Sequence, residues 1–296
     1  MDKAINNSAV LRLISYNSRG LNVSKQAHLR HILEDCDILL LQEHWLSEDQ
    51  LHGLNTLSDD FVSVAVSGFG NDCVLAGRPY GGCAILWRKN LSLTATSVVT
   101  TSRRICAVLF KGIGISFVCL CVYMPYESDS SSVDEFQFQL STVDTIISQY
   151  PDCHIILGGD FNVDMSRNWS NNVILDNYCS QANLLPVIPH ENSAVDYAHH
   201  FNTKHFSLLD HFIVSEQLFQ ASVDKQFVLH DIDNTSDHEP LCMHLVMTVA
   251  QVDFCHRVFK PKPSWDKASD SHIAAYKNLL RTKLSNIVIP YSAITL

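Results

Sequence analysis

Polar residues of catalytic type stand at the ends of short apolar segments of this chain. Residues 154–159 (His-Ile-Ile-Leu-Gly-Gly) lead into Asp160–Asn162, and Ser236–His238 stands just before the apolar segment 240–245. A strand buried in a sheet delivers the residues that follow it to one edge of that sheet. The pattern therefore predicts a fold in which sheet edges gather carboxylates, an amide and an imidazole.

Five expected strand ends carry such polar groups: Asn17, Glu43, Tyr123, Asp160 with Asn162, and Asp237 with His238. Each one alone is weak, because an Asp-x-Asn tripeptide is more often a turn former and a Glu after a strand is usually solvated. Carboxylates, an amide and a histidine are, however, what hydrolysis of a phosphate ester with a hard divalent cation requires. Their recurrence in one chain favours a phosphodiester hydrolase.

Residue periodicity predicts the elements between these ends. Alternating or continuous apolar runs predict strands over residues 11–16, 37–41, 61–66, 83–87, 91–99, 105–110, 115–122, 154–157, 208–214, 223–229 and 240–249. Helical periodicity predicts helices over residues 24–34, 132–149, 173–182, 215–219 and 271–286. Glycines and turn formers predict a loop over residues 68–82. The short turns within residues 83–122 are typical of antiparallel pairing.

Length and composition bound the domain organisation. The chain has 296 residues, 46% of them hydrophobic, which is enough for one large domain or two small ones. We expect that α/β domain over residues 8–250. Residues 251–296 hold the stiff, basic segment Lys260–Pro263 and a helix with too little apolar surface to fold alone. We expect them to be a linker and the start of a module that this chain does not complete.

The sequence also bears on the cellular compartment. No apolar run approaches the ~20 residues of a membrane span, and the N-terminus lacks a basic segment followed by an apolar one. The 10 cysteines are scattered, without a Cys-x-x-Cys pair. We therefore expect buried, reduced thiols, no membrane partner, and a nuclear or cytoplasmic protein that is not secreted.

The formal net charge of −10 limits how the chain can bind DNA. Binding to DNA is driven by neutralisation of phosphates, which an acidic protein opposes. Part of the charge would be local, since a metal site gathers carboxylates that the ion then neutralises. The balance favours a weakly binding catalytic module, or one whose affinity for DNA comes from elsewhere.

Six segments in chain order carry a family pattern: Tyr16-Asn17, Leu41–Glu43, Val122–Pro125, Gly158–Asn162, Ser207–Asp210 and Ser236–His238. Together they resemble the motifs of the endonuclease/exonuclease/phosphatase superfamily, which includes apurinic/apyrimidinic endonucleases and deoxyribonuclease I. The resemblance covers nearly all of residues 11–248. It implies a four-layer sandwich of the DNase I-like fold, in which two packed, mixed, mostly antiparallel sheets are flanked by helices.

A narrower resemblance comes from residues 17–21 (Asn-Ser-Arg-Gly-Leu), 42–46 (Gln-Glu-His-Trp-Leu), 81–87 (Gly-Gly-Cys-Ala-Ile-Leu-Trp) and 263–268 (Pro-Ser-Trp-Asp-Lys-Ala). These segments are similar to the endonuclease domain of non-LTR (LINE-type) retrotransposon polyproteins. The resemblance implies an endonuclease that nicks target DNA to prime reverse transcription. It also implies a reverse transcriptase domain as the partner in a full-length polyprotein, of which this chain resembles an N-terminal piece.

The resemblance and the chemistry together assign the metal ligands. Glu43 is the best ligand for Mg²⁺, with Mn²⁺ as an alternative, because Mg²⁺ is held by one or two carboxylates and keeps several waters. Asn17 and Asp237 would complete or assist that site. Arg19 stands where repair endonucleases of the family carry an acidic residue. It removes a ligand and puts a two-metal mechanism in doubt, and it is either a phosphate-binding cation or a surface charge in a turn.

The same reasoning assigns the catalytic residues. His238 would contact the scissile phosphate, either as a general base or as a cation that stabilises developing charge. Asp210 would orient His238, as carboxylates do in catalytic triads. Asp160 would position or deprotonate the attacking water, Asn162 would bind a phosphate oxygen, and Tyr123 would donate a hydrogen bond near the phosphate.

Some other polar and aromatic residues have a plainer interpretation. His199, His200 and His205 are expected in a solvated loop, since the chain has 15 histidines. Trp45 is expected to be a packing residue. Arg103-Arg104 lies in a turn between strands, where an exposed position is at least as good an explanation as contact with the DNA backbone.

Two other classes of function stay open. The first is another enzyme on the same scaffold, either a phosphatase acting on inositol lipids or sphingomyelin, or an abasic-site nuclease. The acidic charge mildly favours a substrate other than DNA, whereas the segment at residues 263–268 favours the retroelement. The second is a catalytically dead remnant of a retroelement, which the full set of key side chains argues against.

Overall fold

The computed structural model describes residues 8–70, 77–188, 197–201, 205–248 and 269–285. The chain divides into two compact units, Met1–Phe254 and Cys255–Leu296. In the second unit the described element is helix α5 (Asp270–Ser285), which agrees with the helix expected there. The fold below is that of the first unit.

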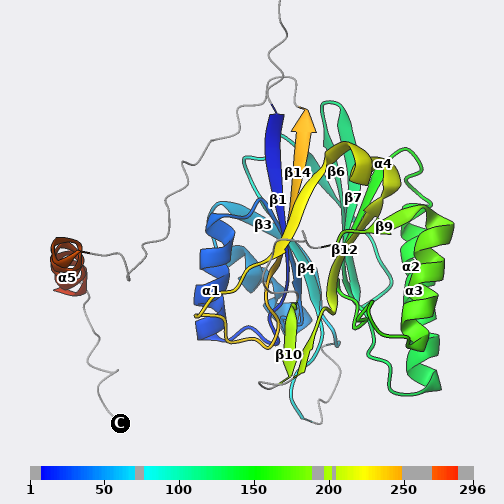
Figure 1. The fold of residues 1–296 in the computed structure, drawn as a ribbon, viewed down its shortest axis with the longest axis horizontal. Coiled ribbons are helices and arrows are strands. Elements are labelled where there is room, and N and C mark those ends of the chain that lie inside the picture. Colours follow the sequence, from blue (N-terminus) through cyan, green and yellow to red (C-terminus); the bar gives the residue numbers. More distant parts are fainter. Residues whose placement is uncertain (1–7, 71–76, 189–196, 202–204, 249–268, 286–296) are drawn as a thin grey trace, which may run out of the picture. The chain divides into compact units, whose positions relative to one another are not determined.

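Two six-stranded sheets face each other in this unit (Figure 1). The first sheet has the strand order β13-β14-β1-β2-β4-β3. Its strands are β13 (Val223–Val228), β14 (Leu241–Thr248), β1 (Ser8–Asn17), β2 (Ile38–Gln42), β4 (Cys83–Arg88) and β3 (Phe61–Val66). Only β1 and β2 are parallel neighbours in this sheet; the other pairs are antiparallel.

The second sheet has the order β5-β6-β7-β8-β12-β9 and one parallel pair, β7 with β8. Its strands are β5 (Thr94–Val98), β6 (Ile105–Gly112), β7 (Ile115–Tyr123), β8 (His154–Asp160), β12 (Asp210–Ser215) and β9 (Leu184–Pro186). A separate two-stranded hairpin consists of β10 (His199–Phe201) and β11 (His205–Ser207). Both large sheets are thus mixed and mostly antiparallel, as predicted.

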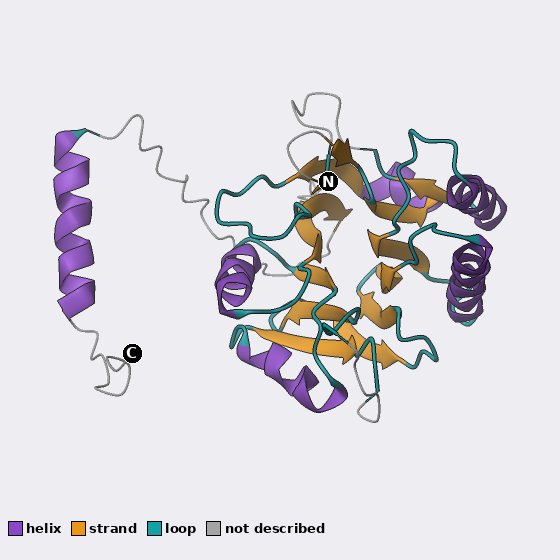
Figure 2. Ribbon diagram, turned by 90° about the horizontal axis from the view of Figure 1, so that it is seen from below, coloured by secondary structure: helices purple, strands orange, loops and turns teal. Residues whose placement is uncertain are grey.

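Helices form the outer layers on both sides (Figure 2). They are α1 (Val23–Glu34), the 3₁₀ helix η1 (Glu48–Thr56), α2 (Ser130–Ile147) and α3 (Ser170–Ala182). The short α4 (Glu216–Ser222) instead packs its Leu218 into the core between the two sheets. Helices α1 and η1 cover the first sheet, and α2 and α3 cover the second. The four-layer sandwich expected from the sequence is confirmed.

The pleat of the strands explains the layers, because successive side chains point to opposite faces of a sheet. Leu13 of β1 joins the core between the two sheets, whereas its neighbour Ile14 packs with Leu29 and Leu33 of α1. In the same way, Cys119 of β7 faces the core between the sheets and its neighbours face α2 and α3. Strands buried on both faces therefore need continuous apolar sequence, which is the pattern seen in residues 37–41.

The pairing of β4 with β5 expected from their short connection is wrong. The two strands belong to different sheets, and the chain passes from the first sheet to the second between them. Leu91 is buried in the core between the sheets, and Leu93 packs against that core. These two apolar residues, which predicted a strand beginning at residue 91, therefore belong to the connection between the two sheets. The pattern also did not predict η1, β9, β10 or β11, which are short or weakly apolar.

Two further findings concern the cysteines and the helices of the described residues. All eight cysteines there are free, and all but Cys153 are buried. Within the same part of the chain, no helix has both the length and the apolar character needed to cross a membrane.

Candidate active site

The second sheet places three predicted residues in one row. Asp160 ends β8, and the strand register puts it beside Tyr123 of β7 and Asp210 of β12. Gly159 permits this close pairing, because a Cβ there would lie 1.9 Å from the carbonyl oxygen of Val122. A strand end with this register therefore brings a phenol and two carboxylates together, as the sequence predicted for sheet edges.

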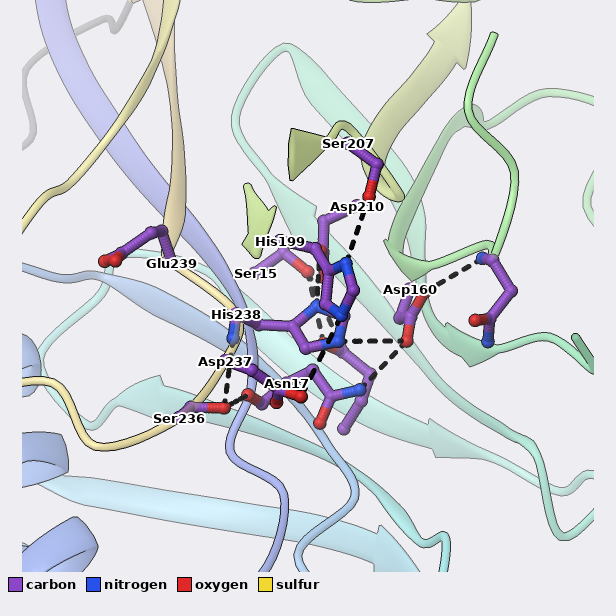
Figure 3. A network of polar contacts seen from close by, with 12 residues as sticks. Ser15, Asn17, Asp160, His199, Ser207, Asp210, Ser236, Asp237, His238 and Glu239 are labelled. Carbon is purple, nitrogen blue, oxygen red and sulfur yellow. Dashed lines mark hydrogen bonds and ion pairs between the residues drawn. The ribbon is translucent and has the colours of Figure 1, made fainter. Parts of the chain in front are cut away.

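Asn17 joins the two sheets at the same end (Figure 3). Its amide Nδ2 donates to Glu43 Oε1 at 3.0 Å and to Asp160 Oδ2 at 2.9 Å. The first bond stays within the first sheet, and the second crosses to the other sheet. The fully buried Asn17 side chain thus ties the proposed metal ligand Glu43 to the carboxylate that would position water.

Glu43 sits in a turn of unusual backbone geometry. Its φ of 51° is left-handed, which is uncommon for a residue with a side chain. The turn is fixed by backbone bonds from Glu43 N to Gly82 O at 2.9 Å and from Trp45 N to Gly81 O at 3.1 Å. Trp45 also donates its ring Nε1–H to Glu43 Oε2 at 2.9 Å, so it orients this carboxylate as well as packing.

His238 lies buried between two carboxylates. Its Nδ1 is 2.7 Å from Asp210 Oδ2, and its Nε2 is 3.8 Å from Asp160 Oδ2. Burial lowers the pKa of His238, but the Asp210 and Asp160 carboxylates outweigh it, and the net shift is upward. Burial likewise raises the pKa of Asp160, against the opposite effect of His238. The ring is thus polarised from both sides, but only Asp210 is within hydrogen-bond distance of it.

A hydrogen-bond network fixes the segment that carries His238. Ser236 Oγ donates to the Asn17 carbonyl oxygen at 2.8 Å. Asn234 donates from Nδ2 to the His238 carbonyl oxygen at 2.7 Å, and its Oδ1 accepts from Tyr16 Oη at 2.7 Å. Asn234 was not among the residues predicted for the site. Its only sequence signal is that it stands four residues before His238.

Asn162 and Tyr123 flank this cluster. Asn162 has a left-handed φ of 51°, its backbone N–H donates to Asp160 Oδ1 at 2.8 Å, and its Nδ2 donates to the Met124 carbonyl oxygen at 2.8 Å. Burial, Glu43 and Asp160 raise the pKa of Tyr123, so its hydroxyl stays protonated and can donate. The Arg104 guanidinium lies over the Tyr123 ring, 5.2 Å from its centroid.

Arg19 reaches the last predicted ligand, Asp237. The Arg19 guanidinium pairs with Asp237 Oδ2, while Asp237 Oδ1 is buried without a hydrogen-bond partner among the described residues. Arg19 is therefore not simply an exposed charge in a turn. The eight predicted site residues are Asn17, Glu43, Tyr123, Asp160, Asn162, Asp210, Asp237 and His238, and all belong to strand ends or adjoining turns at this edge of the two sheets.

His199 corrects the expectation of a solvated loop. It lies in β10, its ring centroid is 4.6 Å from that of His238, and its Nε2 is 3.8 Å from Asp237 Oδ2. His200 lies on the same strand, and its backbone N–H donates to the Asp237 carbonyl oxygen at 2.9 Å. His205 belongs to β11, also not a loop. No local pattern could have revealed the contact between His199 and His238, because it depends on pairing between distant segments.

Arg103 forms an exposed ion pair with Glu48.

The oxygen donors of the cluster fit a hard cation bound through few protein ligands. Within the described residues, no group of three or more His, Cys, Asp or Glu side chains is arranged to hold a metal. Mg²⁺ does not need such a cage, since one or two carboxylates and several waters suffice. The Glu43 carboxylate, the Asn17 amide oxygen and Oδ1 of Asp237, which has no hydrogen-bond partner among the described residues, are donors of this kind.

Comparison with solved structures shows the same fold in several proteins. The AP endonuclease LMAP from Leishmania major has a TM-score of 0.63 and 16% identity, with 80% of this chain and 88% of that chain covered. The endonuclease domain of TRAS1, a telomere-specific non-LTR retrotransposon, has a TM-score of 0.60 and 14% identity, with 80% and 98% covered. The 3′ phosphatase NExo from Neisseria, bound to product DNA hairpin, has a TM-score of 0.60 and 17% identity, with 79% and 99% covered.

Comparison with sequences gives a more specific result. No curated protein matches the chain significantly. The model of the endonuclease/exonuclease/phosphatase family, however, matches residues 14–238, a stretch that contains every predicted site residue. The chain therefore belongs to the endonuclease/exonuclease/phosphatase family.

Proposed function

We propose that this chain is a metal-dependent phosphodiester hydrolase that nicks DNA, in the setting of non-LTR retrotransposition. The observation that carries the proposal is the position of His238, bonded to Asp210 and facing Asp160, which Asn17 in turn ties to Glu43. One cluster thus offers a ligand for a hard cation, a polarised imidazole and a carboxylate that can orient water. Hydrolysis of a phosphate ester needs these three elements.

The residues divide the work as follows. His238 contacts the phosphate and stabilises its charge, with Asp210 fixing which ring nitrogen faces the substrate. Asp160 lies within reach of the same position and orders or deprotonates the attacking water. Tyr123 and Asn162 contact the phosphate oxygens from the flanks.

The cation would be Mg²⁺, or Mn²⁺ in its place, held by Glu43 with help from Asn17 and Asp237. When bound, it would neutralise charge on the phosphate and polarise the bond that breaks. Arg19 favours a mechanism with a single metal ion, because its guanidinium already supplies a positive charge to Asp237. A fixed arginine at this point carries charge without needing a second set of ligands.

DNA as the substrate and the retroelement setting rest on sequence. The segments at residues 17–21, 42–46 and 81–87 resemble retrotransposon endonucleases, and they form the turns around Glu43 and Arg19. The TRAS1 endonuclease domain shares the fold. The net charge of −10 is consistent with a module that acts on DNA without holding it tightly, while another part of a polyprotein binds the target.

Nicking of supercoiled plasmid tests the proposal. The purified chain should convert plasmid to open circle with Mg²⁺, and EDTA or a His238→Ala substitution should abolish the conversion. His230→Ala, at an exposed histidine, is the matched control and should nick at the wild-type rate. A folded chain that leaves plasmid intact but releases phosphate from an inositol phospholipid would be a phosphatase. A folded chain that does neither and binds no Mg²⁺ would be a catalytically dead remnant.

A further inference from the structure

The hairpin β10–β11 is joined to the segment that carries His238 by backbone pairing. His199 and His238 form an antiparallel bridge. On either side of it, the Glu239 N–H donates to the Ala198 carbonyl oxygen at 2.6 Å, and the His200 N–H donates to the Asp237 carbonyl oxygen at 2.9 Å. These bonds fix the backbone of His199 beside His238, whatever conformation its side chain adopts.

The His199 side chain is oriented as well. Its Nδ1 lies 3.0 Å from Ser207 Oγ on the paired strand, which leaves Nε2 facing Asp237 Oδ2 at 3.8 Å (Figure 3). Its ring packs on that of His238, with centroids 4.6 Å apart and an angle of 52° between the planes. Only 18% of the side chain is exposed. A surface histidine would not be held at three points in this way.

The contact with His199 restrains a motion of the His238 ring that the two carboxylates do not prevent. Asp210 bonds His238 at Nδ1, but a single bond at one edge lets an imidazole ring tilt about that bond. Asp160 approaches the other nitrogen only to 3.8 Å, which is beyond hydrogen-bond distance. The His199 ring packs on the ring of His238 and limits this tilt. The Nε2 atom of His199 lies beside the Asp237 carboxylate oxygen that Arg19 also contacts.

We infer that His199 is a positioning residue of the active site, which fixes the ring of His238 and the carboxylate of Asp237 from a hairpin outside both sheets. The inference rests on the proposed function for its effect on catalysis. Its structural part, the restraint of the His238 ring, holds whether or not DNA is the substrate.

Steady-state nicking separates this role from a merely structural one. His199→Ala should lower kcat roughly 10–100-fold, the range found when supporting residues around a metal site are removed, while KM changes less than about twofold. Imidazole added to the assay should restore part of the rate, because it can refill the vacated space. His199→Phe keeps an aromatic ring beside His238 but has no nitrogen facing Asp237, so it should lower kcat less than His199→Ala does. His200→Ala on the same strand is the control and should behave like the wild-type chain.

A measurement without substrate keeps the inference testable if the wild-type chain does not nick. In histidine-labelled protein, the His238 ring resonances should shift and show faster ring motion by NMR in His199→Ala, but not in His200→Ala. An active wild-type chain whose His199→Ala variant has normal kcat and an unchanged His238 spectrum would overturn the inference. An inactive wild-type chain with the expected His238 changes would reject the proposed function and leave the positioning role standing.

Discussion

Asp210 is the residue on which the chemistry of His238 most depends. It is fully buried, its Oδ2 holds His238 Nδ1, and its Oδ1 has no hydrogen-bond partner among the described residues. A charged group in such a place is costly unless it interacts with a cation. Its presence at this edge of the two sheets therefore fits a role in catalysis better than one in stability.

Replacing Asp210 with Asn should keep the shape of the site and remove its charge. The amide cannot stabilise a positive imidazole and can hold the wrong ring tautomer, so kcat for nicking should fall on the order of 10³–10⁴-fold with KM nearly constant. Asp224→Asn on the exposed edge of β13 is the control, and should change neither parameter. A normal rate for Asp210→Asn would show that His238 needs no orienting carboxylate.

His28 gives a prediction for stability rather than activity. It is buried against Tyr16, neither of its ring nitrogens has a hydrogen bond to a described residue, and burial lowers its pKa from the ordinary value of 6.5. A lowered pKa means that the folded chain takes up this proton less readily than the unfolded chain. The free energy of unfolding should therefore hold above pH 6.5 and decrease as the pH falls below that value.

His28→Phe should remove that part of the pH dependence, because it keeps a ring beside Tyr16 but binds no proton. Denaturant unfolding of wild type and variant at pH 7.5 and 5.5 measures the difference. The loss on acidification should be smaller in His28→Phe than in the wild-type chain, and unchanged in the exposed-site control His52→Gln. Equal losses in all three proteins would place the acid sensitivity elsewhere.

At the scale of elements, the position of Glu43 depends on the start of β4. Gly82 accepts the Glu43 N–H bond, has a φ of 92°, and would bring a Cβ within 2.4 Å of the His44 ring. Gly82→Ala should therefore destabilise the domain by about 1–3 kcal/mol and reduce Mg²⁺-dependent nicking as the turn moves. Thermal unfolding and nicking assays check both effects.

Gly53→Ala is the matched control for this substitution. A Cβ at Gly53 meets nothing within 4 Å, so the same chemical change should leave stability and nicking nearly unaffected. Should Gly82→Ala unfold and nick like Gly53→Ala, the backbone at residue 82 would not be what places Glu43.

The elements also show what could be predicted from sequence. Strand ends such as Asp160 were predictable, because an apolar run followed by a polar motif fixes both the strand and the location of its end. The hairpin that carries His199 was not, because its strands are three residues each and their pairing partners lie elsewhere in the chain. Trp45 was expected only to pack, since nothing local to its sequence reveals that its indole N–H faces Glu43.

For the whole molecule, the core and the site fall within one unit of the chain. The buried residues of the three core clusters lie between Leu11 and Met247, and the site lies between Asn17 and His238. A chain of residues 8–250 should thus fold with the melting temperature of the full chain and nick plasmid at the same rate. Lower stability or activity in the shortened chain would show that residues 251–296 support the domain.

Which strands belong to which sheet could not be predicted from the chain alone. An apolar run indicates that a strand is buried on both faces, but both sheets offer that environment. The register that aligns Tyr123, Asp160 and Asp210 follows from pairing between segments far apart in sequence. Family motifs supplied this long-range information in advance, by indicating which strand ends meet.

The amide of Asn17 spans the seam between the two sheets, one hydrogen bond on each side. Apolar cores tolerate small sliding of their layers, whereas a hydrogen bond of about 2.9 Å weakens steeply with displacement. The geometry of the site therefore depends on how the two sheets of the sandwich are aligned. A substitution deep in the core that shifts one sheet by a fraction of an ångström would lower the rate of catalysis while the protein as a whole still remained folded.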